Sequence, residues 1–291
     1  MASALVTPCA KACGALCAEI AKVERLQVEA QMATEAYKPL GTRGPVGDFT
    51  EVSRPEDLKK LGLVPEDLEP SDSEFRAAVF RNARTGETVV AYKGTTMTSV
   101  ADWMANGGQG TVGYSDYYSR AKLIGRSVAQ KAGSPGVSSV KFVGHSLGGG
   151  LASAAAHATG QQASTFNAAG LHLFNRNVFN PPPIDAVRVN GEILTAVQKT
   201  MRGVPLIAPE ASGTPYPIPP PANTASLLTR MALNKWDAIF AGVRLPFKFA
   251  KAALGRAVEL HGMDAVNPAL AEQRTRLADR ADQCGCDCGH P

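Results

Sequence analysis

The sequence predicts an α/β fold in which helices cover both faces of a mainly parallel sheet. From about residue 75 onward, short strand-like runs alternate with helix-like segments, an order typical of parallel sheets whose crossovers are helices. Near the middle of the chain, a strand-like run, a glycine-flanked serine and a run of small residues follow one another directly. A chain of 291 residues with 44% hydrophobic and 19% charged residues suits one large globular domain with additions.

Residues 1–73 are expected to precede the sheet as an extra helix and a surface connection. The helix is expected over residues 10–37, where apolar residues recur at helical spacing. Residues 38–73 are rich in proline, glycine and acidic residues, which favours a connection. Short helical turns are expected to begin at Pro55 and Pro65, because proline suits the first helical position.

The sheet and its helices are expected within residues 74–270. A dense proline run predicts a lid-like loop or polyproline segment at 203–222, inside a lid and helical part at 203–260. Residues 271–291 are expected to form a charged helix and a cysteine-rich tail. The expected strands cover residues 75–81, 88–92, 138–143, 163–167 and 186–190, with a hairpin turn at 82–86, and the expected helices cover 114–132 and 149–156.

The six cysteines all lie near the chain ends. We favour up to three disulfides that tie the two termini together. One alternative is a thiolate metal site that includes His290, although the spacings match no usual zinc pattern. The other is a set of free thiols packed as small apolar side chains. Three cysteines share one helix face and three alternate in the tail: Cys9, Cys13 and Cys17, then Cys284, Cys286 and Cys288.

The N-terminus and the charge limit the partners and the route of the chain. No basic region leads the first 17 residues and Lys11 interrupts them, so we expect no signal peptide, and synthesis in the cytoplasm. No apolar stretch is long enough to cross a bilayer. The net charge of +4 is mild and no basic run carries interleaved aromatics, so no nucleic-acid partner is expected.

The glycine-flanked serine lies in the segment Gly144-His145-Ser146-Leu147-Gly148. Its strand–turn–helix context predicts a nucleophile elbow of an α/β-hydrolase, with the Ser146 hydroxyl at the top of the sheet. The flanking glycines let neighbouring backbone pass closely, and the dipole of the following helix favours a developing oxyanion. The alternative is a glycine-rich turn that contains a serine by chance.

Acyl transfer also needs two amides that bind the oxyanion. Leu147, which follows the serine, is expected to supply one, and Thr95, which follows a strand and a glycine, the other. A plain strand-ending turn is the alternative for Gly94-Thr95.

The motifs together resemble the class 3 lipases, and in particular a bacterial phospholipase-like α/β-hydrolase branch that includes some type VI secretion lipase effectors. The residues that carry the resemblance are Lys93-Gly94-Thr95, Asp102-Trp103, Asn106 and the Gly-His-Ser-Leu-Gly-Gly run. Lys93 and Asn106 depart from the arginine and the acid common in that family. The resemblance covers roughly residues 75–195. It implies a toxin effector exported by a non-classical secretion system to the periplasm of a target cell, and an inhibitory immunity protein as partner.

The histidine base is expected to be His261. It lies late in the chain beside Gly262-Met263-Asp264, near a helix end, which suits a base carried on a loop. The resembling family also has histidine followed by Met-Asp here. His157 is expected to point away from the site, His172 to line the substrate pocket, and His145 to face the core side of the elbow.

The expected triad acid is Glu192. It follows the carboxyl end of the 186–190 strand, and that edge of a parallel sheet faces the active site. In the resembling family an aspartate follows a similar Asn-x-Gly stretch. Asp185, at the other end of the strand, is the second choice and Asp264 the third.

An apolar stripe with neighbouring basic residues follows the proline run. If the stripe meets lipid, Trp236 and Phe240 bind substrate and the basic residues meet phosphates. Packing against the sheet is the commoner meaning of such a stripe.

These features predict a serine lipid esterase, foremost a bacterial phospholipase that binds membranes peripherally. The chemistry requires no metal or other cofactor. One alternative is a soluble carboxylesterase or triacylglycerol lipase with the same triad. The other is a non-catalytic binding module on a hydrolase fold.

Overall fold

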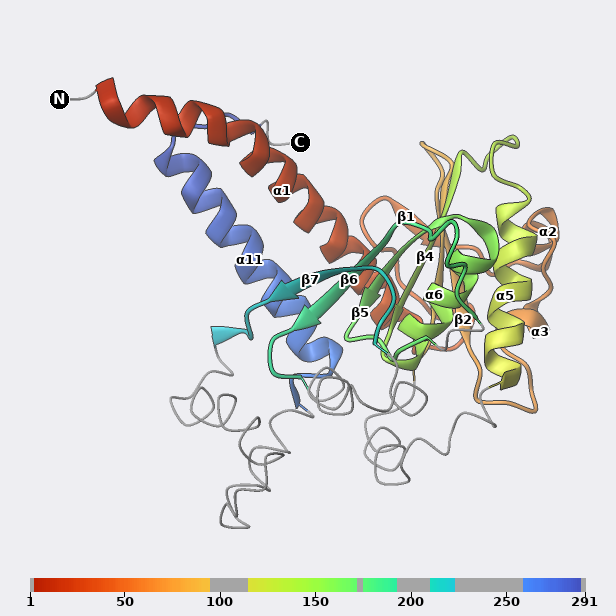
Figure 1. The fold of residues 1–291 in the computed structure, drawn as a ribbon. Helices are drawn as coiled ribbons and strands as arrows, with labels where there is room; N and C mark the ends of the chain where they lie inside the picture. Colours follow the sequence, from red (N-terminus) through yellow and green to blue (C-terminus); the bar gives the residue numbers. More distant parts are fainter. Residues whose placement is uncertain (1–2, 95–114, 172–174, 193–209, 223–258, 289–291) are drawn as a thin grey trace, which may run out of the picture.

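The computed structural model describes residues 3–94, 115–171, 175–192, 210–222 and 259–288 (Figure 1). Its centre is a seven-stranded sheet whose spatial order follows the sequence from β1 to β7. The first three strands are antiparallel, and β3 to β7 are parallel. The strands are β1 (Phe49–Glu51), β2 (Ala77–Asn82), β3 (Glu87–Tyr92), β4 (Ser139–His145), β5 (Gln162–Phe166), β6 (Ile184–Val189) and β7 (Thr214–Ile218).

Helices cover both faces of this sheet, which confirms the predicted mainly parallel α/β-hydrolase fold (Figure 1). On one face α5 (Ser115–Ala129) and α6 (Leu147–Thr159) pack together. On the other face α1 (Ser3–Glu35) lies beside α11 (Met263–Gln283). None of the helices that the structure describes combines the length and apolar character needed to cross a bilayer.

Side-chain alternation along the strands separates the two core layers. In β3, Val90 and Tyr92 join the core under α5 and α6, whereas Val89 and Ala91 face Met32 of α1. Successive residues of a strand point to opposite faces, so a strand covered on both sides is apolar at nearly every position. This explains why β2 and β3 each contain a continuous hydrophobic run rather than an alternating pattern.

The connection between α1 and β2 has the predicted short helices, but it also contains β1, which pairs with β2, so the expectation that the sheet begins only after residue 73 is wrong. The short helices α2 (Pro55–Lys60) and α3 (Pro65–Leu68) begin at the two expected prolines. The β2–β3 hairpin turns at Gly86, whose φ of 77° lies in the left-handed region. Asn82 accepts hydrogen bonds from the amides of Arg84 and Thr85 through its side-chain oxygen.

The structure corrects two expectations for the C-terminal half. Residues 214–218 form strand β7 beside β6, so the loop or polyproline prediction is wrong there. β7 is the edge of the sheet, where one row of N–H groups needs no partner, and Pro215 and Pro217 fit such positions. The expected division at residue 270 falls inside α11, which is continuous from Met263 to Gln283.

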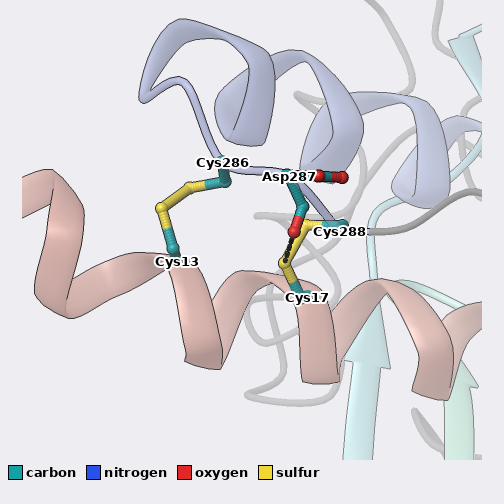
Figure 2. The surroundings of a disulfide bond; sticks show 5 residues. All are labelled: Cys13, Cys17, Cys286, Asp287 and Cys288. Atoms are coloured by element: carbon teal, nitrogen blue, oxygen red, sulfur yellow. Dashed lines mark hydrogen bonds between the residues drawn. A yellow bond between two sulfur atoms is a disulfide. The ribbon is translucent and has the colours of Figure 1, made fainter.

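Disulfides tie α1 to the tail that follows α11 (Figure 2). Cys13 bonds Cys286 and Cys17 bonds Cys288, with Cα–Cα distances of 5.3 and 5.0 Å. Cys284 is disulfide-bonded as well. The predicted pairing of the termini is therefore confirmed for Cys13, Cys17, Cys286 and Cys288. The metal-site and free-thiol alternatives are wrong for these four and for Cys284.

Reduction of these disulfides should lower the melting temperature. The bonds close loops with sequence separations of 273 and 271 residues. For the first such loop, the chain-entropy model gives a stabilisation on the order of 5 kcal/mol, and the second adds less because its ends are already close. Thermal unfolding with and without reductant measures the effect, with a Cys13→Ser/Cys286→Ser variant as a partial control. An unchanged melting temperature after complete reduction would contradict the prediction.

Candidate active site

Ser146 occupies a strained turn between β4 and α6. Its φ of 57° and ψ of −125° are rare for a residue with a side chain, and such conformations cost about 1–3 kcal/mol. Backbone hydrogen bonds hold the turn. The Ser146 amide donates to the Phe166 carbonyl (3.1 Å), and the Ser146 carbonyl accepts from the amides of Gly149 (3.0 Å) and Ala169 (2.9 Å). Strand, turn and helix thus follow one another as the sequence predicts.

The two glycines around the serine are required by close backbone approach. A Cβ on Gly144 would lie 2.2 Å from the Gly148 carbonyl oxygen. A Cβ on Gly148 would lie 2.1 Å from the carbonyl oxygen of Tyr92 in β3. No side chain fits at such distances, so the start of α6 can approach the sheet only with glycine at both positions.

Three of the expected site residues come together in one hydrogen-bonded row. His261 Nε2 lies 2.9 Å from Ser146 Oγ, and His261 Nδ1 lies 2.9 Å from Glu192 Oε2. Ser146, Glu192 and His261 are 2%, 1% and 0% exposed, so water does not compete for these bonds. The row permits a proton to pass from the serine hydroxyl to an imidazole that a carboxylate orients.

The turn after β6 brings Glu192 to the histidine. β6 ends at Val189, Gly191 adopts a φ of 88°, and the Glu192 amide donates to the Val189 carbonyl (3.2 Å). The second choice, Asp185, lies at the opposite end of β6. It pairs there with Lys22 (2.8 Å) and Arg25 (3.2 Å) of α1.

The remaining candidates have different placements. Leu147 is the first residue of α6, where the helix offers its N–H no carbonyl partner of its own. The third-choice acid, Asp264, is exposed in the first turn of α11, a position that the helix dipole favours for a carboxylate. The expected residues Thr95, His172, Trp236 and Phe240, and His290 of the tail, lie outside the described residues.

Two further histidines take part in local hydrogen bonds. As expected, His157 points away from the site. It contacts Ser212 Oγ (2.8 Å) through Nε2 and accepts from the Asn177 amide (3.0 Å) through Nδ1. His145 is buried beneath the elbow, where its Nε2–H donates to the main-chain carbonyl of His261 (2.6 Å) and its Nδ1 accepts from the Tyr37 hydroxyl (2.9 Å).

Asn167 is a residue of the site that the sequence does not predict. It follows β5 with a φ of 44°, is 1% exposed, and donates through Nδ2 to the carbonyls of Leu260 (3.0 Å) and His261 (2.9 Å). Its Oδ1 accepts from the Val189 amide (2.9 Å). The only sequence signal is an asparagine directly after a strand, because asparagine tolerates the left-handed region better than most residues.

Stability should fall as the pH drops from about 6.5 to about 3, and His145 should contribute to the fall. Burial, and then the neighbouring His261, lower the pKa of His145 to about 3. Between that value and the ordinary one near 6.5, the unfolded chain binds a proton that the folded chain excludes. The stability that depends on a neutral His145 is fully present above pH 6.5 and is lost as the pH falls towards 3. The free energy of unfolding, measured by chemical denaturation at several pH values in this window, should depend less steeply on pH for His145→Gln than for the parent. Equal pH dependence of the two proteins would contradict the assignment.

Comparison with known proteins agrees with this geometry. A family model described as a Tle-like phospholipase domain matches residues 28–216. The chain is 31% identical to an extracellular phospholipase A1 of Serratia liquefaciens over 254 residues, 84% of this chain and 70% of that protein.

Similar solved structures include two lipases. A triacylglycerol lipase from Penicillium expansum has a TM-score of 0.48 and 17% identity, and the match covers 69% of this chain and 80% of that one. A Rhizomucor miehei lipase propeptide complex has a TM-score of 0.45 and 16% identity, with 69% and 68% covered. The resemblance to phospholipases predicted from the motifs is confirmed by the family match, which spans most of the chain. The chain belongs to the Tle-like phospholipase family.

Proposed function

We propose that the chain is a serine phospholipase that hydrolyses acyl esters of phospholipids through an acyl-enzyme. The observation that carries the proposal is the buried row in which His261 contacts both Ser146 and Glu192, each at 2.9 Å. The strained backbone of Ser146 supports its role as nucleophile, since backbone strain of this kind is common at active sites.

The reaction follows from the positions of these groups. Ser146 Oγ attacks the acyl carbonyl carbon while His261 Nε2 takes the hydroxyl proton, and the Leu147 amide at the start of α6 binds the oxyanion. His261 returns the proton to the departing alcohol oxygen, which leaves as the lysophospholipid. Water, deprotonated by His261, then attacks the acyl carbonyl carbon, and the fatty acid leaves as His261 returns the proton to Ser146 Oγ. The Thr95 amide stays a predicted second oxyanion donor.

The proposed substrate is a phospholipid because the family and the Serratia relative are both named phospholipases. A fluorophosphonate probe should label Ser146, identified by the mass of the modified peptide. Mass analysis of the products from defined phospholipids should then show a fatty acid and a lysophospholipid. Faster hydrolysis of triacylglycerols or soluble esters would favour the lipase or carboxylesterase alternative, and absence of labelling would favour a non-catalytic protein.

Substitution of the two acids should separate their roles. Glu192→Gln keeps the shape but removes the charge beside His261, so we expect kcat to fall on the order of 10²- to 10⁴-fold. Asp185→Asn weakens the pairs with Lys22 and Arg25, and should lower the melting temperature while kcat stays near that of the parent. A larger loss of kcat in folded Asp185→Asn would contradict the assignment.

The proposal extends to where the enzyme works. Disulfides persist in oxidising compartments, and the Serratia relative is named extracellular, so we propose action outside the cytoplasm. Peripheral membrane contact through Trp236 and Phe240, an antibacterial effector role and an immunity protein stay predictions from the sequence. An effector directed to the bacterial periplasm should inhibit growth, and Ser146→Ala should abolish this inhibition.

A further inference from the structure

We propose that Asn167 and His145 are positioning residues that hold the main-chain carbonyl of His261 and thereby set the imidazole between Ser146 and Glu192. The inference rests on the proposed function, because it assigns His261 as the base. Both side chains donate to the same oxygen, Asn167 Nδ2 at 2.9 Å and His145 Nε2 at 2.6 Å. Both are buried, at 1% and 3% exposure.

Asn167 connects the base to the turn that carries the acid. Its Nδ2 also bonds the Leu260 carbonyl, while its Oδ1 accepts from the Val189 amide. The Val189 carbonyl in turn accepts from the Glu192 amide. One carboxamide therefore fixes the backbone of the histidine loop against the end of β6, and this fixes the distance between His261 and Glu192.

His145 donates to the same oxygen from the end of β4. A carbonyl oxygen only accepts, so the His145 proton is on Nε2, and Nδ1 is left to accept from Tyr37. Burial keeps the ring neutral, which preserves this tautomer at working pH. Because His145 directly precedes Ser146, it ties the backbone of the base to the backbone of the nucleophile.

The backbone conformation of Asn167 does not by itself explain its side chain. Glycine satisfies the left-handed backbone at position 167 as well as asparagine does, so the backbone alone does not require the carboxamide. A catalytic histidine needs an accurate position, since a displacement of about 1 Å can cost about 10²-fold in rate. Two donors on its own carbonyl restrict the loop at the residue where such a displacement matters most.

The test compares turnover with stability in matched variants. Asn167→Gly removes the carboxamide and keeps the backbone, while Asn167→Asp, when ionised, keeps the acceptor for Val189 and loses both donors. For both, we expect kcat and the rate of fluorophosphonate labelling to fall about 10- to 100-fold with little change in KM. The control is Asn82→Gly, which removes a buried carboxamide in the β2–β3 hairpin. It should lower the melting temperature and leave kcat unchanged.

His145 is tested by loss and rescue of its donor. His145→Phe keeps an aromatic ring without the Nε2–H, whereas the amide of His145→Gln can donate from nearly the same place. We expect a loss of kcat in the first and substantial recovery in the second. Because both residues bond one oxygen, His145→Phe combined with Asn167→Gly should lose more than the product of the single losses.

Each outcome bears on the proposal. Unchanged kcat in folded Asn167→Gly, or an additive double variant, overturns it. If Asn167→Gly does not fold, unchanged kcat in Asn167→Asp overturns it equally. If Ser146→Ala is inactive and the Asn167 variants have the parental kcat, the proposed function is supported and only the positioning role is excluded. If Ser146→Ala still turns over phospholipid, both proposals are excluded.

Discussion

Replacing Ser146 with alanine should reduce phospholipid turnover by on the order of 10³-fold or more and leave the fold intact. The hydroxyl is the atom that His261 contacts at 2.9 Å, and no other group on the turn can form the acyl ester. Alanine keeps the Cβ in the strained turn, so the hydrogen bonds of the elbow backbone are retained. Initial rates on a defined phospholipid, together with circular dichroism and melting temperature, measure both parts of this result.

Ser153→Ala is a suitable control for this variant. Ser153 lies on α6, is equally buried, and its hydroxyl donates to the Gly149 carbonyl (2.9 Å) rather than to the site. It should show parental turnover. Near-normal hydrolysis by folded Ser146→Ala would exclude the serine mechanism.

Replacing His261 with alanine should be about as damaging as removing the serine. The serine, the base and the acid act as a unit, so losing one member removes most of what the others contribute. For the same reason, His261→Ala combined with Ser146→Ala should be hardly worse than either alone. Rates of fluorophosphonate labelling provide a second measurement, because an unactivated serine reacts slowly.

His157→Ala controls for the general effect of removing a histidine. His157 bonds Ser212 and Asn177, away from the site, so turnover per folded molecule should not change. If folded His261→Ala keeps more than about a tenth of the parental rate, the base is a different group.

The sequence was sufficient for the parts of the site that local chemistry determines. The elbow could be predicted because strand, glycines, serine and helix are adjacent in the chain. The placement of Glu192 at this edge could be predicted because the parallel sheet brings the carboxyl ends of its strands there, and Glu192 lies three residues after the end of β6. His261 needed its place near a helix end and the resemblance to the lipase family.

The supporting contacts could not be predicted because they depend on the packing of distant segments. Asn167 bonds residues 93 and 94 positions away, and Tyr37 meets His145 across 108 positions. Hydrogen-bonding capacity is visible in a sequence, but the choice of partner depends on the tertiary fold. β7 was missed for a related reason, since a proline-rich strand is acceptable only at a sheet edge, and the sequence does not mark which strand is the edge.

The bonds Cys13–Cys286 and Cys17–Cys288 make most of the chain a covalently closed ring. A protease that cuts one exposed loop within this ring opens it but releases no fragment. Ser146, Glu192 and His261 then stay on one covalent molecule, and the pieces on either side of the cut remain at high effective concentration for each other. Only a second cut, or reduction of the disulfides, separates them. For an enzyme that meets foreign proteases, tying the two ends together therefore makes single nicks tolerable.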